Sequence, residues 1–161
     1  MIKQKTAKVK ESISWTGDIT LIFENAKTGK KRIRRYKNLM TTAGKEAIAR
    51  RLKNEALKSN ECIVTYVAVG TGAGAPAAGD TTLDTELARK AVTSTSRSSN
   101  IVTIRSFFTT SEANGTLTEM GLFGEDASAA ADSGTLFNHA TIAETKTGAE
   151  TLTVEVAITI S

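Results

Sequence analysis

The segment over residues 151–160 imposes the strongest constraint on the fold of this chain. Its odd positions carry polar or small residues, and its even positions are all apolar: Leu152, Val154, Val156, Ile158 and Ile160. A period of two residues is typical of a β-strand with one buried face. Such a strand would be an aggregation hazard if its edge stayed unpaired. The segment therefore predicts a sheet, with this strand inside it or paired across a subunit boundary.

Further short strands are predicted along the chain. They cover residues 7–15, 19–23, 30–37, 63–69, 94–96, 101–108, 116–123 and 135–142. Turn signals at Gly17-Asp18, at residues 25–29 and at Asn114-Gly115 separate some of them, and residues 82–91 fit either a helical turn or an edge strand. Many short strands between turn signals indicate a mainly β protein, an antiparallel β-sandwich of the Ig-like or jelly-roll-like kind.

One amphipathic α-helix interrupts this pattern near residues 42–58. Thr41 or Thr42 can cap its start, and its apolar stripe consists of Ala43, Ala47, Ile48 and Leu52. The length of 161 residues suits one domain. We therefore predict a single β-sandwich domain over residues 1–161, with an N-terminal basic hairpin (1–36), the helical region (37–60) and the main sandwich strands (61–161).

Cysteine, histidine and proline each occur only once, as Cys62, His139 and Pro76. One cysteine cannot form an internal disulfide framework or a structural zinc site. Any Ser-His-Asp site must use His139, but no Gly-x-Ser-x-Gly turn marks a nucleophile, so we interpret His139 as an ordinary strand histidine. The sequence predicts no catalytic residue, no metal site and no cofactor.

The small residues over 70–79 include three alternating glycines, which invite comparison with a phosphate-binding loop. No lysine follows them, and Pro76 among alanines is a poor helix start, so we interpret the segment as a surface loop. The carboxylate pairs Glu125-Asp126 and Asp84/Glu86 lack the spacing of a calcium loop. We expect them on the solvated surface.

Charge is distributed unevenly between the two parts of the chain. Residues 1–60 hold 16 Lys and Arg against 5 Asp and Glu, whereas residues 61–161 hold 5 against 12. This asymmetry fits contact with nucleic acid or a membrane, head-to-tail self-association, or internal neutralisation between the two parts.

The basic residues that could form an interaction surface fall on one predicted strand and on the helix. They are Lys30, Lys31, Arg32, Arg34, Arg35, Lys37, Arg50, Arg51 and Lys53. Strand alternation divides the first six between two faces, and only Tyr36 could serve as a stacking platform. We therefore favour contact with an acidic protein surface, including that of a neighbouring copy, over nucleic acid.

Several segments together resemble a family of small structural proteins of tailed bacteriophages and prophages, which are described as tail-fibre-like. The resemblance rests on residues 66–72, 75–76, 79–83 and 86–89, on 114–123, and on 150–154, with 37–44 leading into the helix. It covers about residues 37–161. The family implies a virion structural role and no catalytic residues.

These observations predict a non-enzymatic, self-assembling virion protein that is made in the host cytoplasm. We expect it in the tail, as part of the tube, of the tip or baseplate, or of a fibre attachment. Capsid decoration is the alternative, and a glycan- or receptor-binding module or a basic nucleic-acid-binding protein are further ones. The expected partners are other copies of the chain and other virion proteins, with no membrane and no small-molecule substrate.

Overall fold

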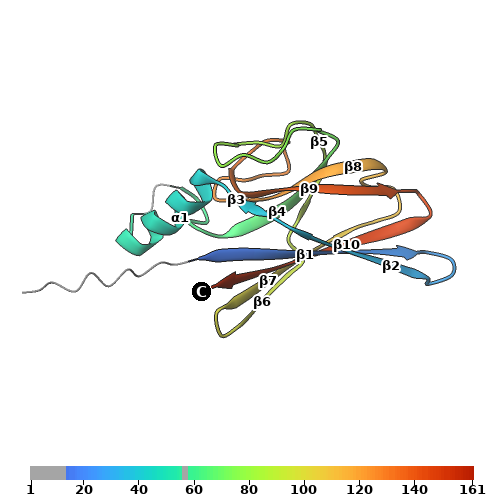
Figure 1. Ribbon diagram of the computed structural model, residues 1–161, viewed down its shortest axis with the longest axis horizontal. Coiled ribbons are helices and arrows are strands. Elements are labelled where there is room, and N and C mark those ends of the chain that lie inside the picture. The colour runs from blue at the N-terminus through green and yellow to red at the C-terminus, as the bar shows by residue number, and fades with distance from the viewer. Residues whose placement is uncertain (1–13, 56–57) are drawn as a thin grey trace, which may run out of the picture.

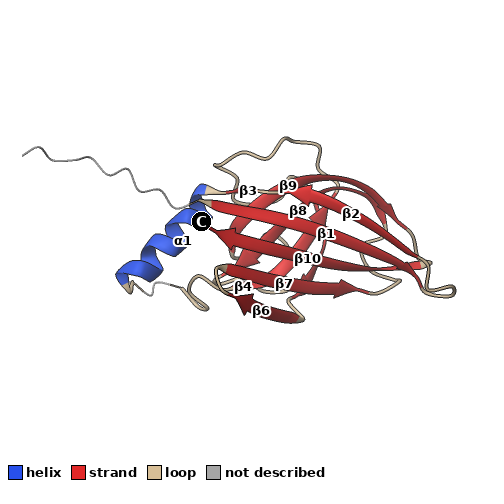
Figure 2. Ribbon diagram, turned by 60° about the horizontal axis from the view of Figure 1, so that its bottom comes forward, coloured by secondary structure: helices blue, strands red, loops and turns tan. Residues whose placement is uncertain are grey.

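The computed structural model describes residues 14–55 and 58–161. They form two five-stranded antiparallel sheets, with a helix at one end (Figure 1, Figure 2). The prediction of a mainly β antiparallel sandwich with one short helix is confirmed. Most of the first expected strand falls on residues 7–13, which lie outside the described residues.

The first sheet has the strand order β2-β1-β10-β7-β6. Its strands are β1 (Trp15–Asn25), β2 (Lys31–Lys37), β6 (Ser94–Ser98), β7 (Ile101–Phe108) and β10 (Glu150–Ile160). The C-terminal strand β10 is hydrogen-bonded to β1 on one side and to β7 on the other. It is therefore an interior strand with both edges paired.

The second sheet has the order β3-β9-β8-β4-β5. Its strands are β3 (Leu39–Met40), β4 (Val64–Gly70), β5 (Glu86–Ala91), β8 (Gly115–Gly124) and β9 (Thr135–Lys146). The sequence of residues 82–91 fitted either a helical turn or an edge strand. The structure has an edge strand there, β5, which pairs with β4.

The core lies between the two sheets. Phe23 of β1 and Phe108 of β7 are fully buried on one side, and Leu117 of β8 and Phe137 of β9 are buried on the other. Burial of such large side chains contributes about 1.5–3 kcal/mol each. In β1 and β10 the inward positions follow the alternation in the sequence, whereas β4, β8 and β9 also contain runs of consecutive buried residues.

The turn expected at Gly17-Asp18 is wrong. Both residues lie within β1 and pair with Ile158 and Ala157 of β10. The glycine has a packing role instead, because a Cβ atom on Gly17 would come within 2.2 Å of the Asn38 amide. Glycine at this position leaves space for the Asn38 side chain, and the chain continues as an extended strand without a turn.

Helix α1 (Thr42–Lys53) sits against β9. Thr41 caps it by accepting a hydrogen bond from the Gly44 N–H at 3.0 Å. Gly44 faces the strand so closely that a Cβ atom would lie 2.5 Å from the carbonyl oxygen of Phe137. Asn54 has a left-handed conformation (φ 58°), which ends the helix before the expected boundary at residue 58.

Candidate functional site

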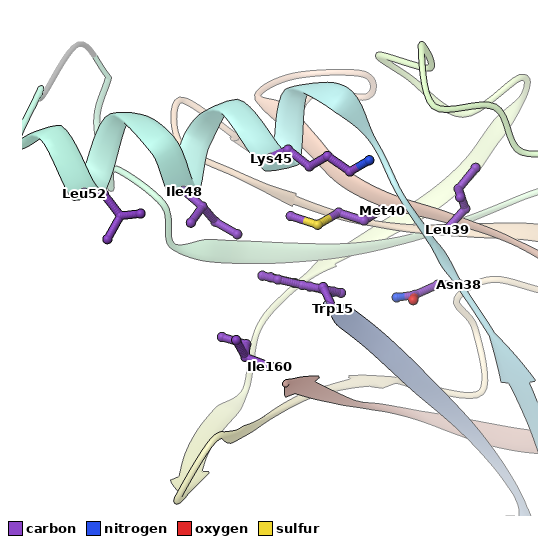
Figure 3. Close-up of a pocket in the computed structure, with 8 residues that line it drawn as sticks. All are labelled: Trp15, Asn38, Leu39, Met40, Lys45, Ile48, Leu52 and Ile160. Atoms are coloured by element: carbon purple, nitrogen blue, oxygen red, sulfur yellow. The ribbon is translucent and has the colours of Figure 1, made fainter. Parts of the chain in front are cut away.

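An open groove lies between α1 and the end of the sandwich where β1 begins and β10 ends (Figure 3). Its volume is about 660 Å³. It is lined by Trp15, Asn38, Leu39, Met40, Lys45, Ile48, Leu52 and Ile160. Six of these eight residues are apolar. An apolar hollow of this kind on a protein surface is typical of a binding site.

Strand pairing and helical spacing bring the walls of the groove together. Trp15 and Ile160 are direct partners across β1 and β10. Ile48 and Leu52 lie one turn apart on α1 and point from the helix toward that strand pair (Figure 3). The side chains stay open to solvent, since Leu52 is 79% exposed and Ile160 is 40% exposed. The groove can therefore accept apolar side chains from another molecule.

Two polar side chains in the groove lack partners. The indole nitrogen of Trp15 and both polar atoms of the Asn38 amide are buried without a hydrogen-bond partner within the described part of the chain. Buried polar groups of this kind normally form hydrogen bonds. These atoms are enclosed within the wall of the groove, so an incoming chain reaches them only if that wall rearranges.

The rim of the groove on the helix side carries a positive charge at Lys45, which lines the groove. Lys45, Arg51 and Lys53 are exposed on α1, and the first turn of the helix carries no acidic residue. Lys53 has a nearby counter-charge in Glu55, at 2.9 Å. A partner that combines apolar side chains with carboxylates would match both the groove and its rim.

The six basic residues predicted on the strand lie on or just before β2, at the edge of the first sheet. Four of them form ion pairs: Lys31 with Glu24, Arg32 with Glu144 and Glu150, Arg34 with Glu144, and Lys37 with Asp18. Arg32 also covers the ring of the buried Phe23 at 3.8 Å. Within residues 14–55 and 58–161, Lys30 and Arg35 form no ion pair.

The three basic residues predicted on the helix have different environments. Arg50 contacts Glu125 at 2.7 Å and Glu61 at 2.9 Å, and Glu125 is completely buried. The hydrogen bond to Glu61 raises the pKa of Arg50 above its ordinary value, and the hydrogen bond to Glu125 acts in the same direction. Arg51 and Lys53 remain exposed. Arg50 is therefore a structural residue, whereas Arg51 and Lys53 lie on the exposed surface of α1.

These ion pairs join the two oppositely charged parts of the chain. Basic residues of the segment 1–60 contact acidic residues of the segment 61–161 in the pairs Arg32–Glu144, Arg32–Glu150, Arg34–Glu144, Arg50–Glu61, Arg50–Glu125 and Lys58–Glu125. Internal neutralisation thus accounts for a substantial part of the charge asymmetry.

The solvated surface expected for the carboxylate pairs is wrong for two of the four residues. Glu125 is 0% exposed and is held by Arg50. The Glu86 side chain is 3% exposed and pairs with Arg89 at 2.6 Å. Both carboxylates have an arginine partner, which is the usual condition for burying a charge. The sequence alone did not show which arginine would approach them.

Glu119 of β8 anchors the long loop between β4 and β5, and the sequence did not predict this role. Its carboxylate is buried and accepts hydrogen bonds from the backbone N–H groups of Gly72 and Thr85, both at 2.8 Å, and of Asp84, at 2.9 Å. A Cβ atom on Gly72 would lie 2.4 Å from the carboxylate. The glycines at positions 70 and 72 therefore leave space for the carboxylate of Glu119, in the loop that was compared with a phosphate-binding loop.

His139 connects this carboxylate to a second one. Its Nε2 atom lies 3.0 Å from Glu119 and its Nδ1 atom lies 2.7 Å from Asp80. An imidazolium that donates at both nitrogens satisfies this geometry. The backbone N–H of Ala77, together with His139, lowers the pKa of Asp80. His139 lies in a strand as expected, and both of its nitrogens are engaged in a buried network that fixes the loop.

Comparison of the chain with family models, with curated proteins and with solved structures found no match in any of the three. Residues 14–55 and 58–161 contain no group of three or more His, Cys, Asp or Glu side chains placed to hold a metal ion. Over the same residues, no helix has the length and apolar character needed to cross a membrane.

Proposed function

We propose that this protein is a non-catalytic structural subunit of a tailed-bacteriophage particle and that it joins a neighbouring copy through the groove beneath α1. The observation that carries the proposal is the groove itself, where the exposed apolar side chains of Leu52 and Ile160 lie beside Trp15. Aromatic residues in desolvated pockets often dominate the energy of protein interfaces. The resemblance in sequence supplies the phage context.

The charge of the rim supports a second copy as the occupant. α1 presents Lys45 in the lining of the groove. The residues after position 60 carry an excess of acidic side chains. An apolar segment with neighbouring carboxylates from that part of another copy would fit the groove and pair with its rim. Such a contact uses different surfaces on its two sides, so it generates rings or filaments.

The buried polar residues support a non-catalytic role. His139 is 1% exposed, and each of its nitrogens contacts a carboxylate. A general base needs a free nitrogen within reach of a substrate proton. The most polar buried cluster of the fold therefore serves to hold a loop.

The test is the assembly state of the purified protein, measured by light scattering and negative-stain electron microscopy. Leu52→Asp places a charge in the groove, and its site is exposed enough to leave the fold intact. Leu87→Asp is the matched control, because Leu87 is also exposed (43%) and lies on β5, away from the groove. Circular dichroism checks that both variants fold.

We expect the wild type and Leu87→Asp to form rings, tubes or filaments, and Leu52→Asp to stay monomeric. Assembly of all three proteins, or a wild type that stays monomeric at high concentration, contradicts the proposal. The symmetry of the particles separates the two locations within a virion. Stacked rings or tubes support the tail, and closed trimers support capsid decoration.

A further inference from the structure

Lys146 is a buried lysine in an unusual position. It is the last residue of β9 and is 1% exposed. Its side chain continues the inward-facing row of the strand, after Ile142 and Glu144. A lysine in the interior of a protein normally pairs with a carboxylate. Among residues 14–55 and 58–161, no carboxylate lies within ion-pair distance of Lys146.

The partners of Lys146 are neutral oxygens. Its Nζ atom lies 2.9 Å from Oδ1 of Asn114 and 3.4 Å from the carbonyl oxygen of Thr110. A protonated lysine has three donors, whereas a neutral amine has two donors and one lone pair. Two acceptors match the neutral amine. Burial also lowers the pKa of Lys146, against the opposing charges of Glu150 and Glu112.

Asn114 is held in place to face this amine. It directly precedes β8, and the next residue, Gly115, pairs with Lys146 across the β8–β9 ladder. Its Nδ2 atom donates to the carbonyl oxygen of Thr110 at 2.8 Å, which turns the side-chain carbonyl toward Nζ. The amide and the amine therefore lie together at one end of the sandwich, and neither belongs to the groove beneath α1.

We propose that Lys146 and Asn114 form an intramolecular isopeptide bond. The lone pair of Nζ attacks Cγ of Asn114, which is one bond away from the oxygen that Nζ contacts. A bond forms between Nζ and Cγ, the bond from Cγ to Nδ2 breaks, and a proton passes from Nζ to the departing nitrogen, which leaves as ammonia. No oxidant or other reactant is needed. Desolvated lysine amines act as nucleophiles by the same physical principle.

The bond would close the open end of the β8–β9 pair with a covalent link. The structure already aligns these strands over their length, from Gly115 opposite Lys146 to Gly124 opposite Thr135. A cross-link at one end prevents the strands from separating there when the rest of the fold opens. The proposal does not depend on assembly through the groove.

The sequence offers a direct test by trypsin digestion and mass spectrometry of the full chain. Between Arg105 and Lys146 there is no other lysine or arginine, so both reacting residues fall in one tryptic peptide, 106–146. An amide-linked Lys146 resists trypsin. The cross-linked protein should therefore yield peptide 106–161 with the loss of one ammonia, in place of the separate peptides 106–146 and 147–161.

Two variants identify the reacting groups. Lys146→Arg keeps the positive charge, removes the nucleophile and restores cleavage at position 146. Asn114→Ala removes the amide at an exposed side chain, so it should fold even if Lys146→Arg does not. Both should retain the mass expected from their sequences. Asn100→Ala is the matched control, because it alters an exposed asparagine before β7 and should still lose ammonia.

Other outcomes contradict the proposal. Loss of ammonia with normal cleavage after Lys146 would indicate a succinimide at Asn114-Gly115, which forms without the lysine. A wild-type protein at its full expected mass would show that the amine and the amide share only a hydrogen bond. Loss of ammonia that persists in Asn114→Ala would place the reaction elsewhere in the chain.

Discussion

Replacement of Glu119 by glutamine tests whether the buried carboxylate holds the loop between β4 and β5. Oε1 accepts from the N–H groups of Gly72 and Thr85, and Oε2 accepts from the N–H of Asp84 and contacts a nitrogen of His139. Glutamine has nearly the same shape, but its NH₂ group only donates. At the Oε1 position the NH₂ group would meet two N–H donors, and at the Oε2 position it would meet the N–H of Asp84, so at least one hydrogen bond is lost in either orientation.

The expected cost follows from these contacts. A hydrogen bond to a charged group contributes about 1.5–3 kcal/mol, so the loss of at least one costs at least about 1.5–3 kcal/mol. Domains of ordinary size are stable by about 5–15 kcal/mol. We therefore expect Glu119→Gln to remove a large part of the free energy of unfolding.

Urea unfolding followed by circular dichroism measures this effect. Glu155→Gln is the matched control, because Glu155 pairs with Arg105 on the exposed face of the first sheet, where an ion pair contributes about 0–1 kcal/mol. Hydrogen exchange at the amides of Gly72, Asp84 and Thr85 should accelerate in Glu119→Gln alone. If the two variants differ by less than about 1 kcal/mol, the network does not have the structural role assigned to it.

Further predictions concern the helix and the response to acid. Gly44→Ala should destabilise the protein by about 1–3 kcal/mol in thermal unfolding, because its added methyl group would lie 2.5 Å from a carbonyl oxygen of β9. Gly79→Ala is the control and should have little effect, because a methyl group at position 79 would point into open space. Arg50→Met should cost up to about 3–5 kcal/mol in denaturant titration, since it removes the nearer cation from the buried Glu125 and leaves Lys58 at 3.6 Å. Arg51→Met on the exposed face should cost less than about 0.5 kcal/mol. Hydrogen bonds from the side chain of Lys90 and from the backbone N–H of Thr109 lower the pKa of Glu112 from 4.5 to about 2. The ionised Glu112 side chain therefore stabilises the fold fully above pH 4.5, and this contribution is lost as the pH falls toward 2. Glu112→Gln should therefore reduce the pH dependence of unfolding in that window, and an unchanged acid-unfolding curve would contradict this assignment.

Hydrophobic alternation predicted the strands with one buried face, such as β10, but it did not decide β5 or predict the short β3. In β10 the predicted face is buried from Leu152 to Ile158. Gly17-Asp18 was misread as a turn because the reason for the glycine lies in a distant residue, Asn38, whose amide occupies the space of a side chain. A local pattern cannot distinguish a glycine that turns the chain from one that admits a neighbour.

The sequence did not predict the groove or the Glu119 network, because both depend on contacts between distant segments. Trp15 meets Ile160 only after β1 and β10 pair along their whole length. Asp80, Glu119 and His139 come from a loop and two strands, and no short spacing marks them as a set. The basic residues were visible in the sequence, but their environments depend on which carboxylates the fold places beside them.

The helix that forms one wall of the groove is held at two points by buried contacts. Its first turn is capped by Thr41, and Gly44 packs directly on the backbone of β9. Its last turn is fixed by Arg50, which pairs with the fully buried Glu125. Ile48 lies between these two points and faces the groove. Because the wall is fixed before any partner arrives, binding does not require the helix to become ordered, and more of the energy from burying apolar side chains remains available for affinity.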